Sequence, residues 1–133
     1  LEKIAELSKK ASRVLSTTSP KVKSNVLKYA AKEIKKGVSF IIYPEGTRTF
    51  GESVAPFKKG SFLLARYAHA PVVPVTIIGA HRCLPRGSLL IRPGRMQIIL
   101  HSPVHFEDYH RLDMQAFSDK VRSPIVKSYR QVS

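Results

Sequence analysis

The stretch Val38-Ser39-Phe40-Ile41-Ile42-Tyr43-Pro44-Glu45-Gly46-Thr47-Arg48 decides the fold. Its first six residues are β-branched, aromatic or small and almost continuously apolar, which is typical of a strand covered on both faces. Such strands belong to α/β sheets, so we predict an α/β domain with a mixed or largely parallel buried sheet flanked by helices. The five residues that follow lie at the carboxyl end of this strand, where open α/β sheets bind their ligands.

The segments on both sides of this strand carry alternating helix and strand patterns. We expect helices at 1–15, 22–34, 60–70 and 114–129 and strands at 72–78 and 96–101. Gly37 stands where the second helix should end, and Pro124 should kink or break the last one. No repeat, linker or low-complexity tract divides the chain, so residues 1–133 are predicted to form a single domain.

Composition restricts the partners and the compartment. The 133 residues include 23 Lys and Arg against 9 Asp and Glu, a formal net charge of +14. This charge favours anionic partners: nucleic acid, anionic lipid or phosphorylated metabolites. Cys83 is the only cysteine, which excludes an internal disulfide and fits a reducing compartment. The longest apolar stretch, around 72–80, is too short for a helix that spans a bilayer.

The loop after the first strand has the chemistry of an anion site. Pro44 removes a backbone donor and helps to end sheet pairing, and Gly46 can adopt the positive φ of a sharp reversal. Arg48 offers a planar fork of donors that matches phosphate oxygens, and Thr47 adds a hydroxyl. Glu45 can hold Arg48 in position or accept a bond from a substrate hydroxyl. The alternative interpretation is a turn with a Glu–Arg surface pair.

Four segments in the same order then resemble one family. The stretch 43–48 resembles the Phe-Pro-Glu-Gly-Thr-Arg motif of the glycerolipid acyltransferases, the 1-acylglycerol-3-phosphate O-acyltransferases. Residues 56–62 resemble their Pro-Phe-Lys-Lys-Gly-x-Phe segment, 71–79 their Val-Pro-Val block and 84–94 their conserved tail. The resemblance covers about Val22 to Val104 and implies a glycerol-3-phosphate acyltransferase-like fold.

The resemblance also implies an activity and its site residues. Family members move an acyl group from acyl-CoA or acyl carrier protein, the co-substrate, to lysophosphatidate in phospholipid biosynthesis, without a further cofactor. The implied phosphate-binding residues are Glu45, Gly46, Thr47 and Arg48, with Lys58 and Lys59 as supporting charges. The implied acyl-side residues are Val73, Pro74, Val75 and Ile77. These four also fit an ordinary core strand.

The family's catalytic pair, a His-x-x-x-x-Asp motif, is absent. None of the five histidines has an aspartate five positions later. The family's second element, an arginine-bearing Phe-Ile-x-Arg segment, is also missing near residues 14–19, where it should fall. We therefore expect no catalytic residue in this chain. Two interpretations remain: a C-terminal portion of an acyltransferase domain, truncated at its N-terminus and inactive alone, or a complete non-catalytic relative that binds lipid phosphates. A basic nucleic-acid-binding domain is a third, although the aromatic residues do not interleave with the basic ones.

The remaining polar clusters complete the expectations. His101, His105 and His110 follow no familiar ligand spacing, so we expect no metal site. The lysines of the second helix should attract anionic headgroups, and Arg82, Arg86, Arg92 and Arg95 should receive coenzyme A phosphates or an acidic carrier protein. We accordingly expect a membrane-associated protein on the cytoplasmic face, with a lysophospholipid acceptor and an acyl donor as partners and no nucleic acid. The sequence leaves the oligomeric state open.

Overall fold

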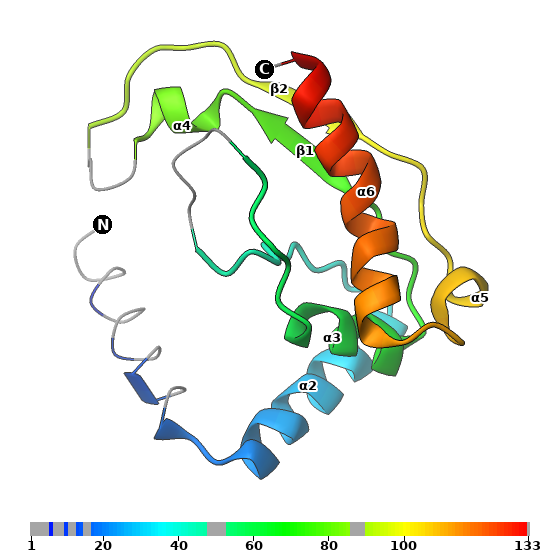
Figure 1. The fold of residues 1–133 in the computed structure, drawn as a ribbon. Coiled ribbons are helices and arrows are strands. Elements are labelled where there is room, and N and C mark those ends of the chain that lie inside the picture. The colour runs from blue at the N-terminus through cyan, green and yellow to red at the C-terminus, as the bar shows by residue number, and fades with distance from the viewer. Residues whose placement is uncertain are drawn as a thin grey trace.

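The computed structural model describes residues 6, 10, 13–14, 17–47, 53–85 and 90–132 (Figure 1). Their elements are α2 (Pro20–Lys35), α3 (Gly60–Ala68), β1 (Val75–Ile78), α4 (Ala80–Cys83), β2 (Gln97–Leu100), α5 (Phe106–Tyr109) and α6 (Met114–Val132). The helix expected at 1–15 lies largely outside the described residues. The helices expected at 22–34 and 60–70 are confirmed as α2 and α3.

Helix α2 begins and ends where its sequence signals stand. The Ser19 hydroxyl oxygen accepts a hydrogen bond from the Val22 amide at 3.5 Å, and Pro20 occupies the first turn, where its missing N–H costs nothing. Gly37 follows the helix with φ of 97°, as expected for a C-terminal cap. Only one side of α2 is covered, because Ala31 packs with α3 while most other side chains remain exposed.

The described sheet has two antiparallel strands. Val75 pairs with Leu100, Thr76 with Ile99, Ile77 with Ile98 and Ile78 with Gln97. An isolated bridge between Val72 and Val104 extends the contact toward α5. The strands expected at 72–78 and 96–101 are present in shortened form. The parallel pairing that we predicted does not occur among the described residues, and one face of the sheet remains open.

The segment 38–43, predicted as a covered strand, forms no strand in this structure. All of its side chains are exposed, with Ile41 reaching 85%. The prediction was wrong here because a strand needs a partner for its backbone and a layer on each face. Among the described residues, no such partner strand pairs with this segment.

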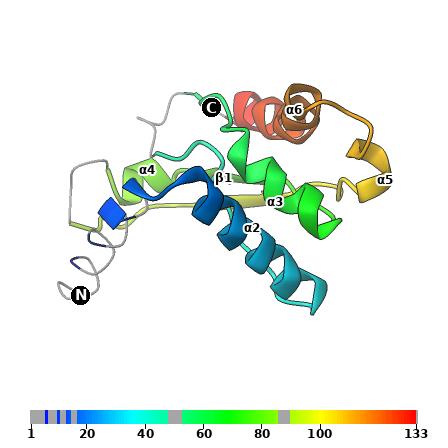
Figure 2. The same cartoon turned by 90° about the horizontal axis from the view of Figure 1, so that it is seen from below.

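The core lies between α3, α5 and α6. Tyr109 and Phe117 are fully buried and stack with their ring centroids 3.9 Å apart, and Phe62 meets Phe117 edge-on at 5.0 Å. The Tyr109 hydroxyl donates a shared hydrogen bond to two carbonyl oxygens, that of Ala70 at 2.7 Å and that of Ala65 at 3.1 Å. This cluster fastens α6 over one side of the β1–β2 ribbon (Figure 2).

The last helix is longer than expected. Asp113 caps α6, since its Oδ1 accepts hydrogen bonds from the amides of Gln115 at 2.7 Å and Ala116 at 2.8 Å. The helix continues through Pro124, so the predicted break is wrong. Proline removes only one donor from a 19-residue helix whose preceding turns are held by buried Phe117 and Val121. No helix among the described residues is long and apolar enough to span a bilayer.

Candidate functional site

The loop after Tyr43 is a tight turn closed by a lysine. The Gly46 amide donates to the Tyr43 carbonyl oxygen at 3.1 Å, and Gly46 has φ of 68°. A methyl group added at Gly46 would meet Nζ and Cε of Lys58 at 2.8 Å. The positive φ favours glycine here, and a side chain at this position would also displace the flexible end of Lys58, whose ammonium group lies directly against the turn.

A second segment, residues 54–58, holds this turn in place. The Lys58 amide donates to the Pro44 carbonyl oxygen at 2.8 Å. Glu45 Oε2 accepts a hydrogen bond from the Ala55 amide at 3.0 Å. The sequence offered two roles for Glu45, holding Arg48 or accepting from a substrate, and the structure shows a third: its carboxylate ties the turn to the chain ten residues later. Arg48 itself lies outside the described residues.

Arg122 of α6 completes the arrangement. Its Nη2 donates to the Val54 carbonyl oxygen at 2.6 Å and its Nε to the Ala55 carbonyl oxygen at 3.3 Å, while the guanidinium lies 6.0 Å from the centroid of the Phe57 ring. A path of hydrogen bonds thus runs from Glu45 through Ala55 to α6. Arg122 was not predicted from the sequence, where it is one of four basic residues of α6 and nothing marks it out from the others.

The structure therefore brings together part of the predicted phosphate-binding set. Glu45, Gly46 and Lys58 meet through the contacts above. Thr47 follows them and is exposed, and Lys59 is an exposed residue at the start of α3. The Gly46 turn therefore lies beside two exposed lysines, Lys58 and Lys59. Their positive charges and hydrogen-bond donors suit the binding of an anion.

The predicted acyl-side residues separate into two groups. Val73, Val75 and Ile77 are exposed, and Val75 and Ile77 lie on the open face of β1, whereas Pro74 is buried. Leu100 stands opposite Val75, and Ile98 opposite Ile77, on the same face. The open face is therefore a continuous apolar surface.

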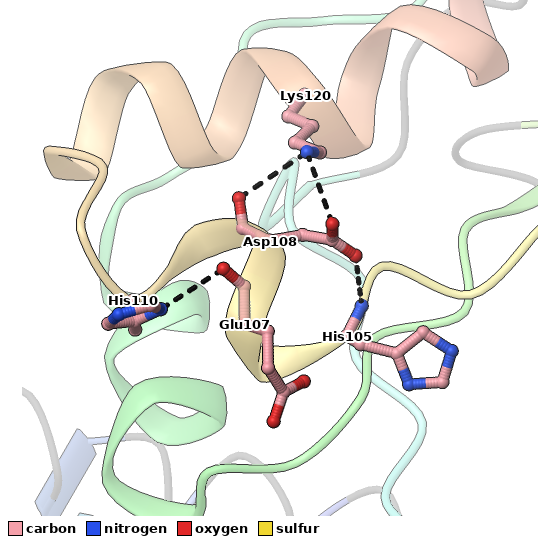
Figure 3. Close-up of polar contacts among 5 residues, drawn as sticks. All are labelled: His105, Glu107, Asp108, His110 and Lys120. Carbon is pink, nitrogen blue, oxygen red and sulfur yellow. Dashed lines mark hydrogen bonds and ion pairs between the residues drawn. The ribbon is translucent and has the colours of Figure 1, made fainter.

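The three histidines between 101 and 110 do not converge. His101 Nε2 lies 2.8 Å from the Thr76 hydroxyl oxygen, and His110 Nδ1 lies 3.1 Å from the Glu107 carbonyl oxygen. The rings of His105 and His110 lie on opposite sides of α5, and Asp108 accepts from the His105 amide at 3.0 Å (Figure 3). Among the described residues, no three His, Cys, Asp or Glu side chains gather closely enough to hold a metal ion.

The two predicted basic groups are both solvent-exposed where described. Arg82, Arg92 and Arg95 are exposed around the α4–β2 connection, and Arg86 lies outside the described residues. On α2 and just after it, the exposed lysines are Lys21, Lys23, Lys28, Lys32, Lys35 and Lys36. The same helix also exposes the apolar side chains of Val22, Val26 and Tyr29.

Comparison with known proteins finds relatives that share one enzyme name. A 1-acyl-sn-glycerol-3-phosphate acyltransferase of Brassica napus is 33% identical over 120 residues, 90% of this chain and 33% of the relative. The enzyme of that name from Arabidopsis thaliana is 35% identical over 92 residues, 68% of this chain and 26% of the relative. The alpha form from Bos taurus is 33% identical over 92 residues, covering 69% and 32%. The chain spans about a third of these relatives.

A solved structure agrees with the sequence relatives. The crystal structure of PlsC, a 1-acyl-sn-glycerophosphate (LPA) acyltransferase from Thermotoga maritima, matches with a TM-score of 0.72 and 30% identity over 80% of this chain and 43% of that chain. The family described as Acyltransferase matches residues 4–78, more than half of the chain. This chain therefore belongs to the acyltransferase family, and its fold is that of the corresponding part of PlsC.

Proposed function

We propose that this chain forms the acceptor-binding part of an enzyme that transfers an acyl group from acyl-CoA or acyl carrier protein to lysophosphatidate. The reaction class is supported by the relatives, which are 1-acyl-sn-glycerol-3-phosphate acyltransferases by name. The observation that carries the proposal is the Gly46 turn, with the Lys58 ammonium group against it and the Glu45 carboxylate anchoring it.

In the proposed complex, the acceptor phosphate sits at the Gly46 turn. Lys58 donates to its oxygens, the Arg48 guanidinium clamps it with paired donors, and Thr47 and Lys59 add a hydroxyl and a charge. Glu45 acts as a positioning residue, because its bond to Ala55 fixes the turn relative to α6. The acyl chain lies along the open apolar face that holds Val75 and Ile77.

The acyl transfer then needs a base that these 133 residues do not supply by the family's motif. The acceptor hydroxyl oxygen attacks the thioester carbonyl carbon, the hydroxyl proton passes to the base, and the C–S bond breaks to release the donor thiol. We place the base, a His–Asp pair, outside this chain and infer that the chain alone is inactive. We also propose that in the longer enzyme 38–43 joins a larger sheet, in which parallel pairing covers it.

The basic side of α2 supports binding of the protein to a membrane surface. Its exposed lysines flank Val22, Val26 and Tyr29, so one face offers both charge and apolar contact. Each lysine near an anionic leaflet contributes about 1 kcal/mol. We propose the cytoplasmic face of a membrane, and expect binding to vesicles that contain phosphatidylserine to fall steeply as salt is added.

The acceptor site is tested by binding, which does not need the base. Titration calorimetry with a short-chain 1-acylglycerol 3-phosphate, kept below its micelle concentration, should show that Arg48→Ala weakens binding roughly ten- to a hundredfold. Lys58→Met should weaken it by a smaller factor. Lys35→Met removes a matched exposed lysine from α2 and should leave the affinity unchanged. Equal affinity in all four proteins would contradict the assignment.

Glu45 has a conservative control of its own. Glu45→Gln keeps an oxygen that can accept from the Ala55 amide, whereas Glu45→Ala removes it. A positioning role predicts that Glu45→Ala weakens acceptor binding and that Glu45→Gln restores most of it. Loss in both variants would instead show that the negative charge contacts the acceptor.

One observation favours the non-catalytic relative: the missing His-x-x-x-x-Asp motif. A binder and an enzyme segment share the acceptor affinity, so the discriminating assay is acyl transfer by the longest natural polypeptide that contains these residues. Formation of phosphatidate from acyl-CoA and lysophosphatidate supports the enzyme. Tight binding without any transfer supports the non-catalytic relative.

A further inference from the structure

A cleft between α2 and α3 contains none of the residues of the acceptor loop. Its volume is about 160 Å³, and four residues of α2 and one of α3 line it: Lys28, Ala31, Lys32, Lys35 and Tyr67. The two helices pack against each other through Ala31, Leu64 and Ala68 and lie side by side (Figure 1, Figure 2). The cleft therefore has walls from two different elements, with the small side chain of Ala31 where they meet.

The charged side chains of the cleft are all positive. Lys28, Lys32 and Lys35 follow one another at steps of four and three residues, so they lie on one side of α2. Glu33, the acidic residue of this helix, pairs with Lys36 instead. In the described part of the chain, no carboxylate forms an ion pair with any of the three lysines. Like charges at this spacing repel one another, and a bound anion relieves that repulsion.

The dimensions of the cleft suit one phosphate group. Lys28 and Lys35 are seven residues apart, about 10 Å along the helix, and their flexible stems let the ammonium groups turn toward one anion. On the other wall, Tyr67 is 40% exposed and brings a hydroxyl that can donate to a phosphate oxygen. The cleft is smaller than the roughly 300–1,000 Å³ of pockets for whole small molecules, so it admits a phosphate rather than a nucleotide.

Charge and shape both favour a phosphate monoester over a diester. A monoester carries about −1.5 to −2 charges at pH 7, whereas the phosphate of a diester carries a single charge, so three cations attract the monoester more strongly. A monoester also ends in its phosphate and can enter a small cleft end-on. The phosphate of a diester lies between two substituents, and the walls of the cleft obstruct the outer one.

The apolar residues of α2 indicate that a lipid carries this phosphate. At about 100° per residue, the three lysines lie roughly a third of a turn around the helix from the exposed side chains of Val22, Val26 and Tyr29. When such an apolar face contacts a membrane, it sits about 5–10 Å into the boundary between head groups and acyl chains. The helix is about 10–12 Å wide, so the side that carries the cleft lies at the level of the lipid phosphates.

We propose that the cleft between α2 and α3 binds the phosphate monoester head group of a membrane lipid, with phosphatidate as its natural occupant. The phosphate site rests on the cleft, whereas the choice of phosphatidate rests on the proposed function, of which it is the product. One phosphate held by flexible lysines binds weakly in free solution and more strongly where lipid is concentrated at a surface. Occupancy therefore holds the protein on membranes where the product has accumulated.

Vesicle sedimentation with the 133-residue chain tests this site. The phosphatidylcholine vesicles contain either phosphatidate or phosphatidylserine, in proportions that give the same surface charge. The chain should bind the phosphatidate vesicles about fivefold more tightly, and Lys32→Gln/Lys35→Gln should reduce this preference to less than about twofold, because it removes two of the three ammonium groups. Equal binding of the parent to both kinds of vesicle would overturn the proposal.

Two further variants separate the cleft from net charge. Lys21→Gln/Lys23→Gln removes the same charge from exposed positions outside the cleft, so it should weaken binding to both kinds of vesicle and keep the preference. Tyr67→Phe keeps the charge and the ring but removes the hydroxyl, and should reduce the preference in part. Both lysine variants should unfold at the temperature of the parent, since all four side chains are exposed. Equal loss of preference in these two variants would show attraction to net charge and overturn the cleft site.

The acceptor site and a soluble phosphate provide independent checks. Arg48→Ala should keep the preference for phosphatidate vesicles, and a preference lost in that variant would place phosphatidate at the acceptor turn and overturn the cleft site. Release of the chain by glycerol 3-phosphate, at the concentration of the lipid phosphate, would overturn the assignment to a lipid.

The two proposals can also fail separately. Lys32→Gln/Lys35→Gln should keep the affinity for the short-chain 1-acylglycerol 3-phosphate in solution. Loss of acceptor binding with an intact phosphatidate preference would refute the acceptor site alone, and the reverse result would refute the cleft alone.

Discussion

The aromatic cluster beneath α6 and the open face of the sheet are both made of apolar side chains, but the cluster is buried and the open face is exposed. Tyr109 and Phe117 have no exposed surface, whereas Ile98 and Leu100 are 64% and 73% exposed. The cluster draws on α3, α5 and α6, so each ring packs against a side chain from another element. On the open face, the described residues supply no second layer.

The difference shows that apolar residues in a sequence mark a surface that can be buried, but do not show which other element will pack against it. Burial is worth about 25 cal/mol per Å² of apolar area, and this gain is realised only where another element closes over the surface. The cluster is a closed interior, whereas the open face is an exposed apolar surface. Substitutions in the two regions should therefore have very different effects on stability.

The largest effect should follow from opening the cluster. Phe117→Ala removes a fully buried ring that stacks on Tyr109 and meets Phe62, and should lower the free energy of unfolding by about 3–5 kcal/mol. Urea denaturation followed by tyrosine fluorescence measures the change. If Phe117→Ala costs no more than a substitution on the open face, the two regions do not differ as described.

The next effect should come from the buried hydroxyl. Tyr109→Phe leaves the Ala70 carbonyl oxygen without its donor at 2.7 Å, which should cost about 1–3 kcal/mol at neutral pH. Phe keeps the ring and its stacking, so the variant isolates the hydrogen bond. A variant as stable as the parent at neutral pH would show that this bond contributes nothing.

The same hydroxyl gives the cluster a signature at alkaline pH. Burial raises the pKa of Tyr109 from 10.0 to about 12, with Arg66 opposing and Glu107 adding to the shift. Between these values the unfolded chain has lost a proton that the folded chain keeps, so stability falls as pH rises from 10 to 12. The advantage of the parent over Tyr109→Phe should shrink across that window. A constant difference would contradict the raised pKa.

A smaller effect is expected at the cap of α6. Hydrogen bonds from the amides of Ala116 and then Gln115 lower the pKa of Asp113 below its ordinary 3.8, with added help from Lys59 and Arg66. Because the folded pKa is depressed, the stabilisation is present above pH 3.8 and is lost as pH falls through the folded value. Asp113→Asn should therefore reduce the unfolding temperature at pH 7 but not at pH 2, and an equal loss at both would contradict the charge effect.

The smallest effect should come from the open face. Ile98→Ser and Leu100→Ser should each change the free energy of unfolding by less than about 0.5 kcal/mol, because these side chains are already in solvent. Both should reduce binding of the dye ANS, which reports exposed apolar surface. Large destabilisation would show that the face is covered in solution.

The sequence predicted the local elements better than their pairing. Ser19, Pro20 and Gly37 marked α2 because caps act within a few residues. The prediction of a strand at 38–43 was wrong because such a strand needs a layer on each face, and the local sequence does not show whether those layers are present. Pro124 failed as a break because the pattern did not include the packing of Phe117 and Val121.

The candidate site divided in the same way. The loop motif correctly placed a sharp turn at Gly46, since positive φ is a local property of glycine. Lys58 contacts this turn, and the phosphate-binding role that the resemblance implies for both stays a prediction. Arg122 was missed because it follows Ala55 by 67 residues, and nothing in a helical basic residue indicates which distant carbonyl oxygens it will meet.

The two-stranded sheet has a consequence for the solution behaviour of the chain. Each strand has a neighbour on one side only among the described residues, and an unpaired edge is a template onto which another molecule can add. The net charge of +14 keeps such molecules apart through long-range repulsion. Electrolyte weakens that repulsion, since the screening length falls from about 10 Å at 0.1 M to about 3 Å at 1 M. The chain should therefore remain monodisperse in dilute buffer and self-associate as ionic strength rises.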